Sequence, residues 1–254
     1  MIDIHCHILP GVDDGPISIE ESIEMAKEAV DEGIQTIIAT PHHKNGKYDN
    51  GKKHIIDNVK SLNTTLELEK IPLKILPGQE VRIYGELVED YKQGEILTLA
   101  DTIYLFIEFP SSSVPRYAEK LLYDIQNIGL IPIIVHPERN KELLEYPEIL
   151  YKLIRNGALS QVTAGSVAGY FGKSIKKFSH QLIEHNLTHF IASDAHNTHG
   201  RSFKLKEAFQ VIKTEFGDDY SYLFRENSEI MVQNKVVYKE IPAMIKKKKF
   251  LGLF

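Results

Sequence analysis

The sequence predicts an α/β protein in which about seven parallel strands form a closed or nearly closed barrel of the TIM type. Short apolar runs alternate with amphipathic helical patterns along the chain. Such alternation is typical of a parallel sheet covered by helices. An open doubly wound sheet is the alternative, but no Gly-x-Gly-x-x-Gly follows a strand, so a dinucleotide site is not indicated. Metal-type side chains also follow most of the apolar runs, at the strand ends where parallel barrels carry their active sites.

The first strand is predicted at the very N-terminus, where Ile2 and Ile4 alternate with polar residues. Side chains alternate between the two faces of a strand, so His5 and His7 should point the same way. Two imidazoles on one face can hold a divalent metal ion. Cys6, between them, should point the other way into apolar packing.

The rest of the chain follows the same alternation. Ser18 and Glu21 form a capping-box pattern that begins the first helix, and Gly33 ends it. Later strands are predicted at residues 36–39, 73–76, 104–107, 131–135, 159–162 and 189–192. Helices are predicted at about residues 54–68, 117–128, 147–155, 175–185 and 203–216, with a helical or irregular excursion at 86–98 and a mixed C-terminal segment.

Candidate metal ligands stand at the ends of six strands, and one more lies in the loop after the first strand. They exceed what one catalytic metal needs, which favours two or three clustered ions with a bridging carboxylate such as Glu80. The neighbours His43 and Asp13 leave the assignment open by one place at two positions. The candidates are His5, His7, Asp14, His42, Glu80, Glu108, His136, Asp194 and His196.

This ligand set favours phosphoryl-transfer chemistry. It lacks cysteine, which points to manganese, iron or zinc, with magnesium as a further alternative. Two adjacent metal ions can share a hydroxide and clamp an in-line displacement at phosphorus. Arg139 and Arg201 lie on two of the ligand loops and could bind phosphate oxygens in pairs, although each could also be solvated surface charge.

The pattern of these residues resembles the polymerase-and-histidinol-phosphatase (PHP) superfamily. Within it, the stretch HCHILPGVDDGP at residues 5–16 closely resembles the bacterial capsule-biosynthesis protein-tyrosine phosphatases. The resemblance covers essentially the whole chain. It implies a distorted (β/α)7 barrel of the PHP type, a three-metal centre of the manganese type, and dephosphorylation of bacterial tyrosine kinases that control capsular or exopolysaccharide synthesis.

The same resemblance implies a role for each candidate. Arg139 and Arg201 would bind the phosphate. His5, His7, Glu80 and Asp194 would hold one metal, Glu80, Glu108 and His136 the second, and Asp14, His42 and His196 the third.

The reaction that we expect needs no covalent enzyme intermediate. A metal-bridging hydroxide would attack phosphorus, while the metals and arginines neutralise the growing charge and tyrosinate leaves. Cysteine phosphatases instead require Cys, five residues and then Arg, whereas Val12 stands six positions after Cys6. We therefore expect Cys6→Ser to keep most activity; a folded but inactive variant would contradict the metal route.

Composition narrows the class of protein further. The net charge is −5 and the pI about 6.1, so general nucleic-acid binding is not indicated. A single cysteine favours a reducing cytoplasm, and no apolar run reaches the ~20 residues of a membrane helix. We expect one domain over residues 1–254, while the sequence leaves the oligomeric state open. The lysine run at 246–249 should be a solvated tail; attraction to an anionic membrane or an acidic kinase tail is the alternative.

Two further functions are compatible with the same residues. One is a small-molecule phosphoesterase such as histidinol-phosphate phosphatase. The other is a metal-stabilised binding module without turnover. The two arginines and the surplus of candidate ligands argue against this second alternative. Asp3, one step before the histidine pair on its face, could orient a ligand or make a structural hydrogen bond.

Overall fold

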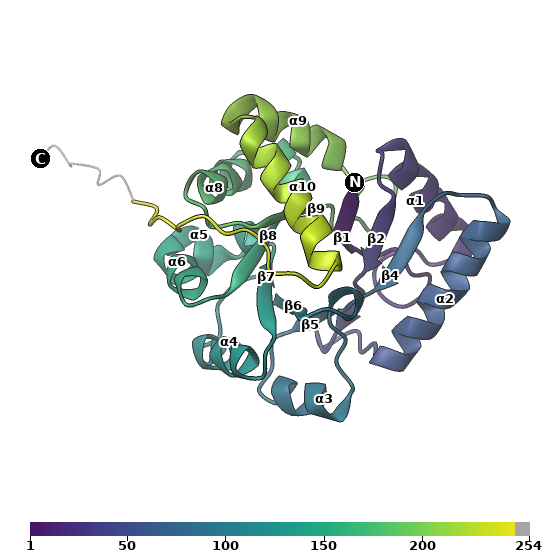
Figure 1. The fold of residues 1–254 in the computed structure, drawn as a ribbon, viewed down its shortest axis with the longest axis horizontal. Helices are drawn as coiled ribbons and strands as arrows, with labels where there is room; N and C mark the ends of the chain where they lie inside the picture. Colours follow the sequence, from purple (N-terminus) through teal and green to yellow (C-terminus); the bar gives the residue numbers. More distant parts are fainter. Residues whose placement is uncertain (247–254) are drawn as a thin grey trace, which may run out of the picture.

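The computed structural model describes residues 1–246, and strands alternate with helices from β1 to α9 (Figure 1). The strands are β1 (Ile2–Cys6), β2 (Thr36–Ala39), β3 (His42–His43), β4 (Lys74–Pro77), β5 (Glu80–Arg82), β6 (Tyr104–Glu108), β7 (Ile131–Val135), β8 (Leu159–Thr163) and β9 (Phe190–Ala192). All their pairings are parallel. The lysines at 247–249 lie outside the described residues.

The helices cover the outside of this sheet, as the βα alternation predicts. They are α1 (Ile19–Asp31), α2 (Lys52–Leu68), α3 (Leu87–Gln93), α4 (Ala118–Asn127), α5 (Lys141–Glu145), α6 (Pro147–Arg155), α7 (Ala164–Ala168), α8 (Lys173–Glu184), α9 (Leu205–Phe216) and α10 (Asp218–Val232), with 3-10 turns η1 (Leu99–Asp101) and η2 (Pro137–Arg139). The capping box of α1 is present, because Ser18 accepts a hydrogen bond from Glu21 N. None of the helices among residues 1–246 is both long and apolar enough to cross a membrane.

The nine strands form seven positions around a barrel, each of which we call a stave. The pairing orders are β1-β2-β4 and β3-β5-β6-β7-β8-β9. Two residues separate β2 from β3, and two separate β4 from β5, so each of these pairs is one interrupted stave. The ring closes where Cys6 bridges Ala195: His7 N donates to Ala195 O at 2.8 Å, and Asp194 N donates to His5 O at 2.8 Å. The predicted seven-stave barrel is confirmed, with the interruptions as its distortion.

Two apolar clusters hold the barrel together. Ile4, Phe106 and Ile133 belong to the cluster inside it. The larger cluster lies between the sheet and the helices, and it contains Cys6, which is fully buried. The ladder of β1 shifts register between Asp3 and Cys6.

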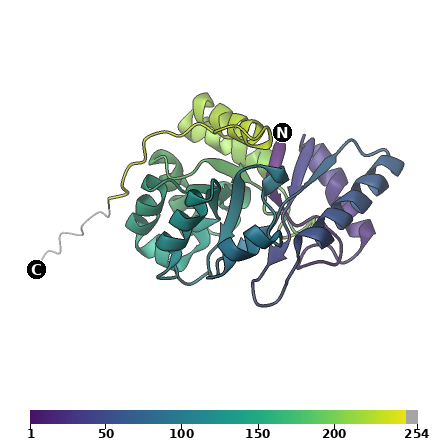
Figure 2. The same cartoon turned by 60° about the horizontal axis from the view of Figure 1, so that its bottom comes forward.

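The last two helices form a pair that the sequence pattern did not predict in full. The prediction at 203–216 matches α9, but α10 falls in what was expected to be a mixed segment. Figure 2 shows α9 and α10 packed side by side, and α10 contacts β1 and β9. Met231 on α10 is fully buried in the cluster inside the barrel, so this helix closes the end opposite the candidate site.

Candidate metal centre

Eight of the nine candidate ligands lie on a strand or within four residues after one, and Asp14 lies in the loop after β1. The first set surrounds the histidine pair of β1. His5 Nε2 and His7 Nε2 are 3.4 Å apart. Asp194 Oδ1 lies 3.5 Å from the first of these nitrogens and 3.4 Å from the second. Glu80 Oε2 lies 3.3 Å from His7 Nε2. These four side chains therefore present their ligand atoms to one small space.

A second set gathers around Asp14 in the loop after β1. Asp14 Oδ1 lies 3.3 Å from His42 Nε2 and 3.3 Å from His196 Nε2. Ligand atoms of these three residues and of His7 all lie within 4.8 Å of one another. One imidazole from the first set is thus also within reach of this second position.

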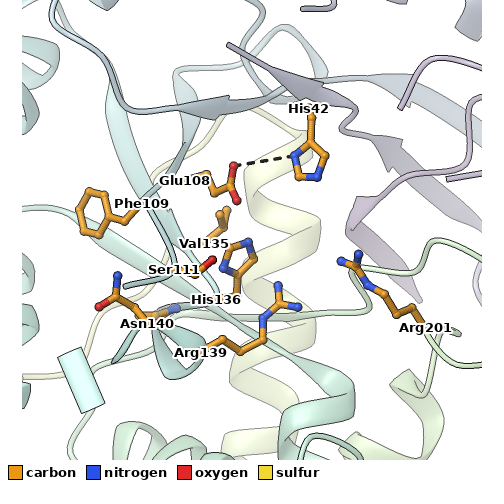
Figure 3. A pocket seen from close by; sticks show the side chains of 10 residues that line it. His42, Glu108, Phe109, Ser111, Val135, His136, Arg139, Asn140 and Arg201 are labelled. Carbon is orange, nitrogen blue, oxygen red and sulfur yellow. Dashed lines mark ion pairs between the residues drawn. The ribbon is translucent and has the colours of Figure 1, made fainter. Parts of the chain in front are cut away.

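The third set centres on the buried carboxylate of Glu80. His136 Nε2 is 2.8 Å from Glu80 Oε1. His42 Nδ1 lies 2.7 Å from Glu80 Oε2 and 3.8 Å from Glu108 Oε2, a pairing drawn in Figure 3. Glu80 therefore lies between the sets, where a bridging carboxylate would have to be.

The cluster contains polar atoms that the protein itself does not satisfy. His42 Nδ1, Glu80 Oε2 and His196 Nε2 are buried and have no hydrogen-bond partner. The first two approach to 2.7 Å without hydrogen-bond geometry. Buried polar atoms in folded proteins nearly always have a partner. Atoms that converge without bonding to one another suit a cation placed between them, so these residues fit divalent metal ions.

Neighbouring side chains fix the orientation of several candidate ligands. Asp13 Oδ2 lies 2.6 Å from His7 Nδ1, and Gln161 Oε1 lies 2.9 Å from His5 Nδ1. In both rings Nδ1 makes this hydrogen bond, so that Nε2 faces the cluster. The sequence offered Asp13 only as a rival ligand, and it gave no signal for Gln161 because that contact crosses the barrel.

Glu108 is held by a residue that sequence reasoning missed. Arg82 Nε donates to Glu108 Oε2 at 2.9 Å, and a second guanidinium nitrogen donates to Oε1 at 3.0 Å. The two residues are register partners on β5 and β6. A bidentate pair of this kind fixes the plane of the carboxylate. Knowledge of the strand register would have revealed the pair.

The loop after β1 is built so tightly that it requires a glycine. Gly15 N donates to Asp13 Oδ1 at 2.9 Å, and a Cβ at this position would lie 2.3 Å from His7 O. Asp13 Oδ2 also accepts from His42 N at 3.1 Å. The loop is thereby locked against β1 and β3, which places Asp14 at the cluster.

The structure separates the close alternatives that the sequence left open. His42 and Asp14 lie in the cluster, whereas His43 turns away and its Nδ1 lies 3.0 Å from Asp49 Oδ1. Asp3 makes a structural hydrogen bond: it accepts from Ser193 N at 3.0 Å and from Ser193 Oγ at 2.5 Å.

Burial disfavours the charged form of each side chain in the cluster, and the neighbouring charged groups determine which pKa values fall. Burial would raise the pKa of Glu80, but the facing His42 holds it well below its usual range. Burial acts in the same way on the pKa of Asp194, which the Arg139 guanidinium holds low. Burial lowers the pKa of His136 to about 4, and Arg139 adds to this shift. At neutral pH these carboxylates are therefore anionic and this imidazole is neutral, the forms that bind metal ions.

Two candidate ligands have strained backbone. Asp194 has φ +53° and His136 has φ +36°, both in the left-handed region that residues other than glycine rarely adopt. His136 directly follows β7, and Asp194 lies two residues after β9. Such strain is typical of functional sites, where surrounding contacts enforce it.

Both predicted arginines line a pocket of about 250 Å³ beside the cluster (Figure 3). Arg139 forms an ion pair with Asp194 Oδ2, and its guanidinium lies 5.5 Å from the ring centre of Phe171. Arg201 lies 3.2 Å from Asp194 Oδ2 and 3.3 Å from Asp14 Oδ2. Two cations thus flank one mouth of the cluster.

The remaining walls of this pocket combine apolar and polar groups. Phe109, Val135 and Pro137 contribute apolar surface, and Ser111 and Asn140 contribute polar groups. The pocket therefore offers anion-binding groups beside apolar surface, which suits a phosphate carried on an organic group.

Comparison with known proteins supports this interpretation. The chain is 52% identical over its full length, and over the relative's full length, to the tyrosine-protein phosphatase YwqE of Bacillus subtilis. It is 43% identical to the putative tyrosine-protein phosphatase CapC of Staphylococcus aureus, again over 100% of both chains. CpsB of Streptococcus pneumoniae is 30% identical over 93% of this chain and 100% of its own.

Solved structures agree with the fold. A crystal structure from a study of YwqE and CpsB, described there as unique metal-dependent tyrosine phosphatases, matches with a TM-score of 0.96 and 52% identity. The match covers 97% of this chain and 100% of that chain. A phosphotriesterase homology protein of Escherichia coli shares only the fold, with a TM-score of 0.55 and 12% identity over 90% of this chain and 97% of that one.

The family that the N-terminal stretch resembled is confirmed by a family model. The model for capsular polysaccharide synthesis, CpsB/CapC, matches residues 1–233. The chain belongs to the CpsB/CapC family.

Proposed function

We propose that this chain is a metal-dependent protein-tyrosine phosphatase, which hydrolyses the phosphate monoester of phosphotyrosine. The observation that carries the proposal is the convergence of nine candidate nitrogen and oxygen ligands beside a pocket with two arginines. Relatives that match over the full length and bear the name tyrosine-protein phosphatase support it.

Nine side chains would hold two or three metal ions. We propose manganese, with iron, zinc or magnesium as the alternatives that this nitrogen and oxygen ligand set also permits. When bound, the ions would supply Lewis acidity toward phosphoryl oxygens and would lower the pKa of a water molecule. Glu80 would lie between ions as a shared carboxylate. The ligands that we propose are His5, His7, Asp14, His42, Glu80, Glu108, His136, Asp194 and His196.

Other residues would orient the ligand histidines and neutralise the charge on the phosphate oxygens. Asp13 and Gln161 keep His7 and His5 in the tautomers whose Nε2 atoms face the cluster. Arg139 and Arg201 would exchange their contacts with Asp194 for the phosphate oxygens and stabilise the charge that grows on them. The buried Cys6 takes no part, since burial raises the pKa of its thiol well above the usual range.

We further propose a bacterial tyrosine kinase of capsular or exopolysaccharide synthesis as the phosphotyrosine-bearing partner. The family's connection with capsular polysaccharide synthesis supports this choice. A cytoplasmic location follows from such a partner, and one domain over residues 1–254 remains our prediction.

The test compares two substrates under controlled metal content. We expect the manganese-loaded protein to hydrolyse a phosphotyrosine peptide with a kcat/KM at least about 100-fold above that for histidinol phosphate, a difference in transition-state binding of ~2.7 kcal/mol. Chelation should abolish turnover, and added manganese should restore it. Preference for histidinol phosphate would assign a small-molecule phosphoesterase instead. Folding lost on chelation, with no turnover under any condition, would indicate a binding module.

A further inference from the structure

A groove larger than the candidate active-site pocket lies on the flank of the barrel. It has a volume of about 970 Å³ and is lined by residues of α5, the start of α6, α8 and the C-terminal segment that ends the described chain. Figure 1 shows where these elements lie in the fold. Phe178 and Ile245 are buried in its floor, and Leu144 stands on its wall. The groove thus offers apolar surface in a concave shape that the catalytic cluster does not use.

Four lysines surround this apolar floor, three of them on α8. Within residues 1–246, none of the four forms an ion pair. The only carboxylate among the lining residues is that of Glu184, at the far end of α8. The lining lysines are Lys173, Lys176, Lys177 and Lys246.

The position of Lys173 at the start of α8 is locally unfavourable. The first turn of α8 contains no acidic residue, and Lys173 is its first residue. The positive end of the helix dipole favours acidic residues there and disfavours lysine. A residue that opposes the helix dipole in this way, without an ion pair to offset it, is typical of binding sites. The protein therefore concentrates unpaired positive charge at this groove although its net charge is −5.

The groove begins close to the candidate active site. Asn140 lines the pocket of the two arginines and caps the N-terminus of α5, and Leu144 lies four residues further along that helix. Residues four apart on a helix are separated by about 6 Å along the axis. An extended peptide advances about 3.3 Å per residue, so a segment of a few residues can reach from one to the other. In addition, η2, which carries Arg139, contacts α8 directly.

We infer that this groove docks an acidic segment of the phosphotyrosine-bearing substrate protein, a few residues away from the tyrosine. This inference rests on the proposed function, because it takes the substrate to be a polypeptide. Unpaired lysines match glutamate and aspartate side chains, and the apolar floor accepts the apolar residues between them. A concave groove suits a chain better than a flat anionic membrane, which could not enter it.

The test measures peptide preference in the full-length, metal-loaded protein. One phosphotyrosine peptide carries glutamates on both sides of the tyrosine; its partner carries glutamines at the same positions. We expect kcat/KM to favour the glutamate peptide by roughly tenfold through a lower KM, since a few exposed ion pairs contribute modestly to binding. The preference should fall as salt screens these charges.

The groove variant is Lys173→Glu, Lys176→Glu and Lys177→Glu in one chain. It should lose the preference for the glutamate peptide yet keep kcat/KM for p-nitrophenyl phosphate within about twofold, because this small substrate has no peptide segment that could contact the groove. The matched control is Lys27→Glu, Lys60→Glu and Lys74→Glu, three exposed lysines on other elements with the same change in net charge. The control should keep the preference.

Each outcome decides the inference. Equal kcat/KM for the two peptides in the wild type, or equal loss in groove and control variants, would overturn it. Groove-dependent binding to phosphatidylserine vesicles with no peptide preference would assign the surface to a membrane instead. If neither peptide is hydrolysed, the proposed function fails; binding of an unphosphorylated glutamate peptide, measured by fluorescence anisotropy, then decides the groove separately.

Discussion

Two buried polar clusters share strand β1, and they differ in whether the protein alone satisfies them. At Asp3, the carboxylate accepts two hydrogen bonds from Ser193, and Ser193 Oγ accepts one from Ala195 N at 3.0 Å. Two residues further along, His5 enters a cluster in which several buried atoms converge without hydrogen bonds. The first cluster fastens the barrel seam between β1 and the end of β9, whereas the second is arranged for something that the chain does not itself supply.

The comparison teaches how to tell a structural network from a ligand site in a buried position. Both contain carboxylates, and burial acts against charge in both. Burial raises the pKa of Asp3 to about 6, because the hydrogen bonds from Ser193 offset it only in part. In the cluster, by contrast, facing cationic groups hold the pKa of Glu80 and of Asp194 well below the usual range. Convergence of buried polar atoms without hydrogen bonds, rather than polarity alone, distinguishes the site.

The largest effect should come from the proposed bridging carboxylate. Glu80→Gln removes a charge from the centre of the cluster, and we expect kcat/KM for a phosphotyrosine peptide to fall by roughly three orders of magnitude. Steady-state kinetics at saturating manganese measures it. The matched control is Glu138→Gln, another fully buried glutamate, whose bonds from Thr163 N and Ser166 Oγ an amide oxygen can keep. Similar losses in both variants would remove the distinction between the two kinds of network.

Asp13→Asn should weaken metal binding without removing a proposed ligand. The carboxylate of Asp13 is a charged acceptor for His7 Nδ1, and the amide of asparagine is not charged. Loss of such an orienting carboxylate lowers metal affinity by about 10- to 100-fold. Calorimetric titration of the metal-free protein with manganese measures the change. An unaltered affinity would mean that the orientation of His7 does not depend on Asp13.

At the seam, the expected loss is of stability rather than of chemistry. Ser193→Ala leaves one Asp3 oxygen buried without a partner, which costs about 1–3 kcal/mol of unfolding free energy. A thermal melt of the metal-free protein should show a Tm lower by roughly 2–4 °C per kcal/mol. The remaining folded protein should keep most of its kcat. A variant with unchanged Tm but little activity would place Ser193 in the site instead.

The last prediction concerns how stability depends on pH at a buried histidine outside the cluster. Burial lowers the pKa of His189 to about 3, and its Nδ1 accepts a hydrogen bond from Ser160 N at 3.2 Å. An unfolded histidine titrates near pH 6.5 and so binds more protons than the folded one between pH 6.5 and 3. Its contribution is therefore complete above pH 6.5 and is lost as the pH falls toward 3.

His189→Asn, which does not titrate, should consequently lose less stability than the wild type between pH 7 and pH 4.5. We expect the two denaturant-unfolding free energies to converge by a few kcal/mol over this range, at ~1.4 kcal/mol per pKa unit. Parallel pH profiles would mean that His189 is not kept neutral in the folded protein.

Much of the fold and site followed from the sequence because strand ends in a parallel barrel meet at one face. Hydrophobic runs placed the main strands, and the residues directly after them placed the candidate ligands. The short strands β3 and β5 were not predicted, because Pro41 and Gly78 interrupt the staves before them. The bonds of Arg82 to Glu108 and of Gln161 to His5 also could not be predicted, since they depend on strand register and on contacts across the barrel.

The most direct test of the account is anomalous diffraction from crystals of the manganese-loaded protein. We expect two or three anomalous peaks enclosed by the nine candidate ligands, with Glu80 between two of them and Asp3 in contact with none. Peaks elsewhere, or a cluster that closes on itself through hydrogen bonds and excludes the ions, would contradict it.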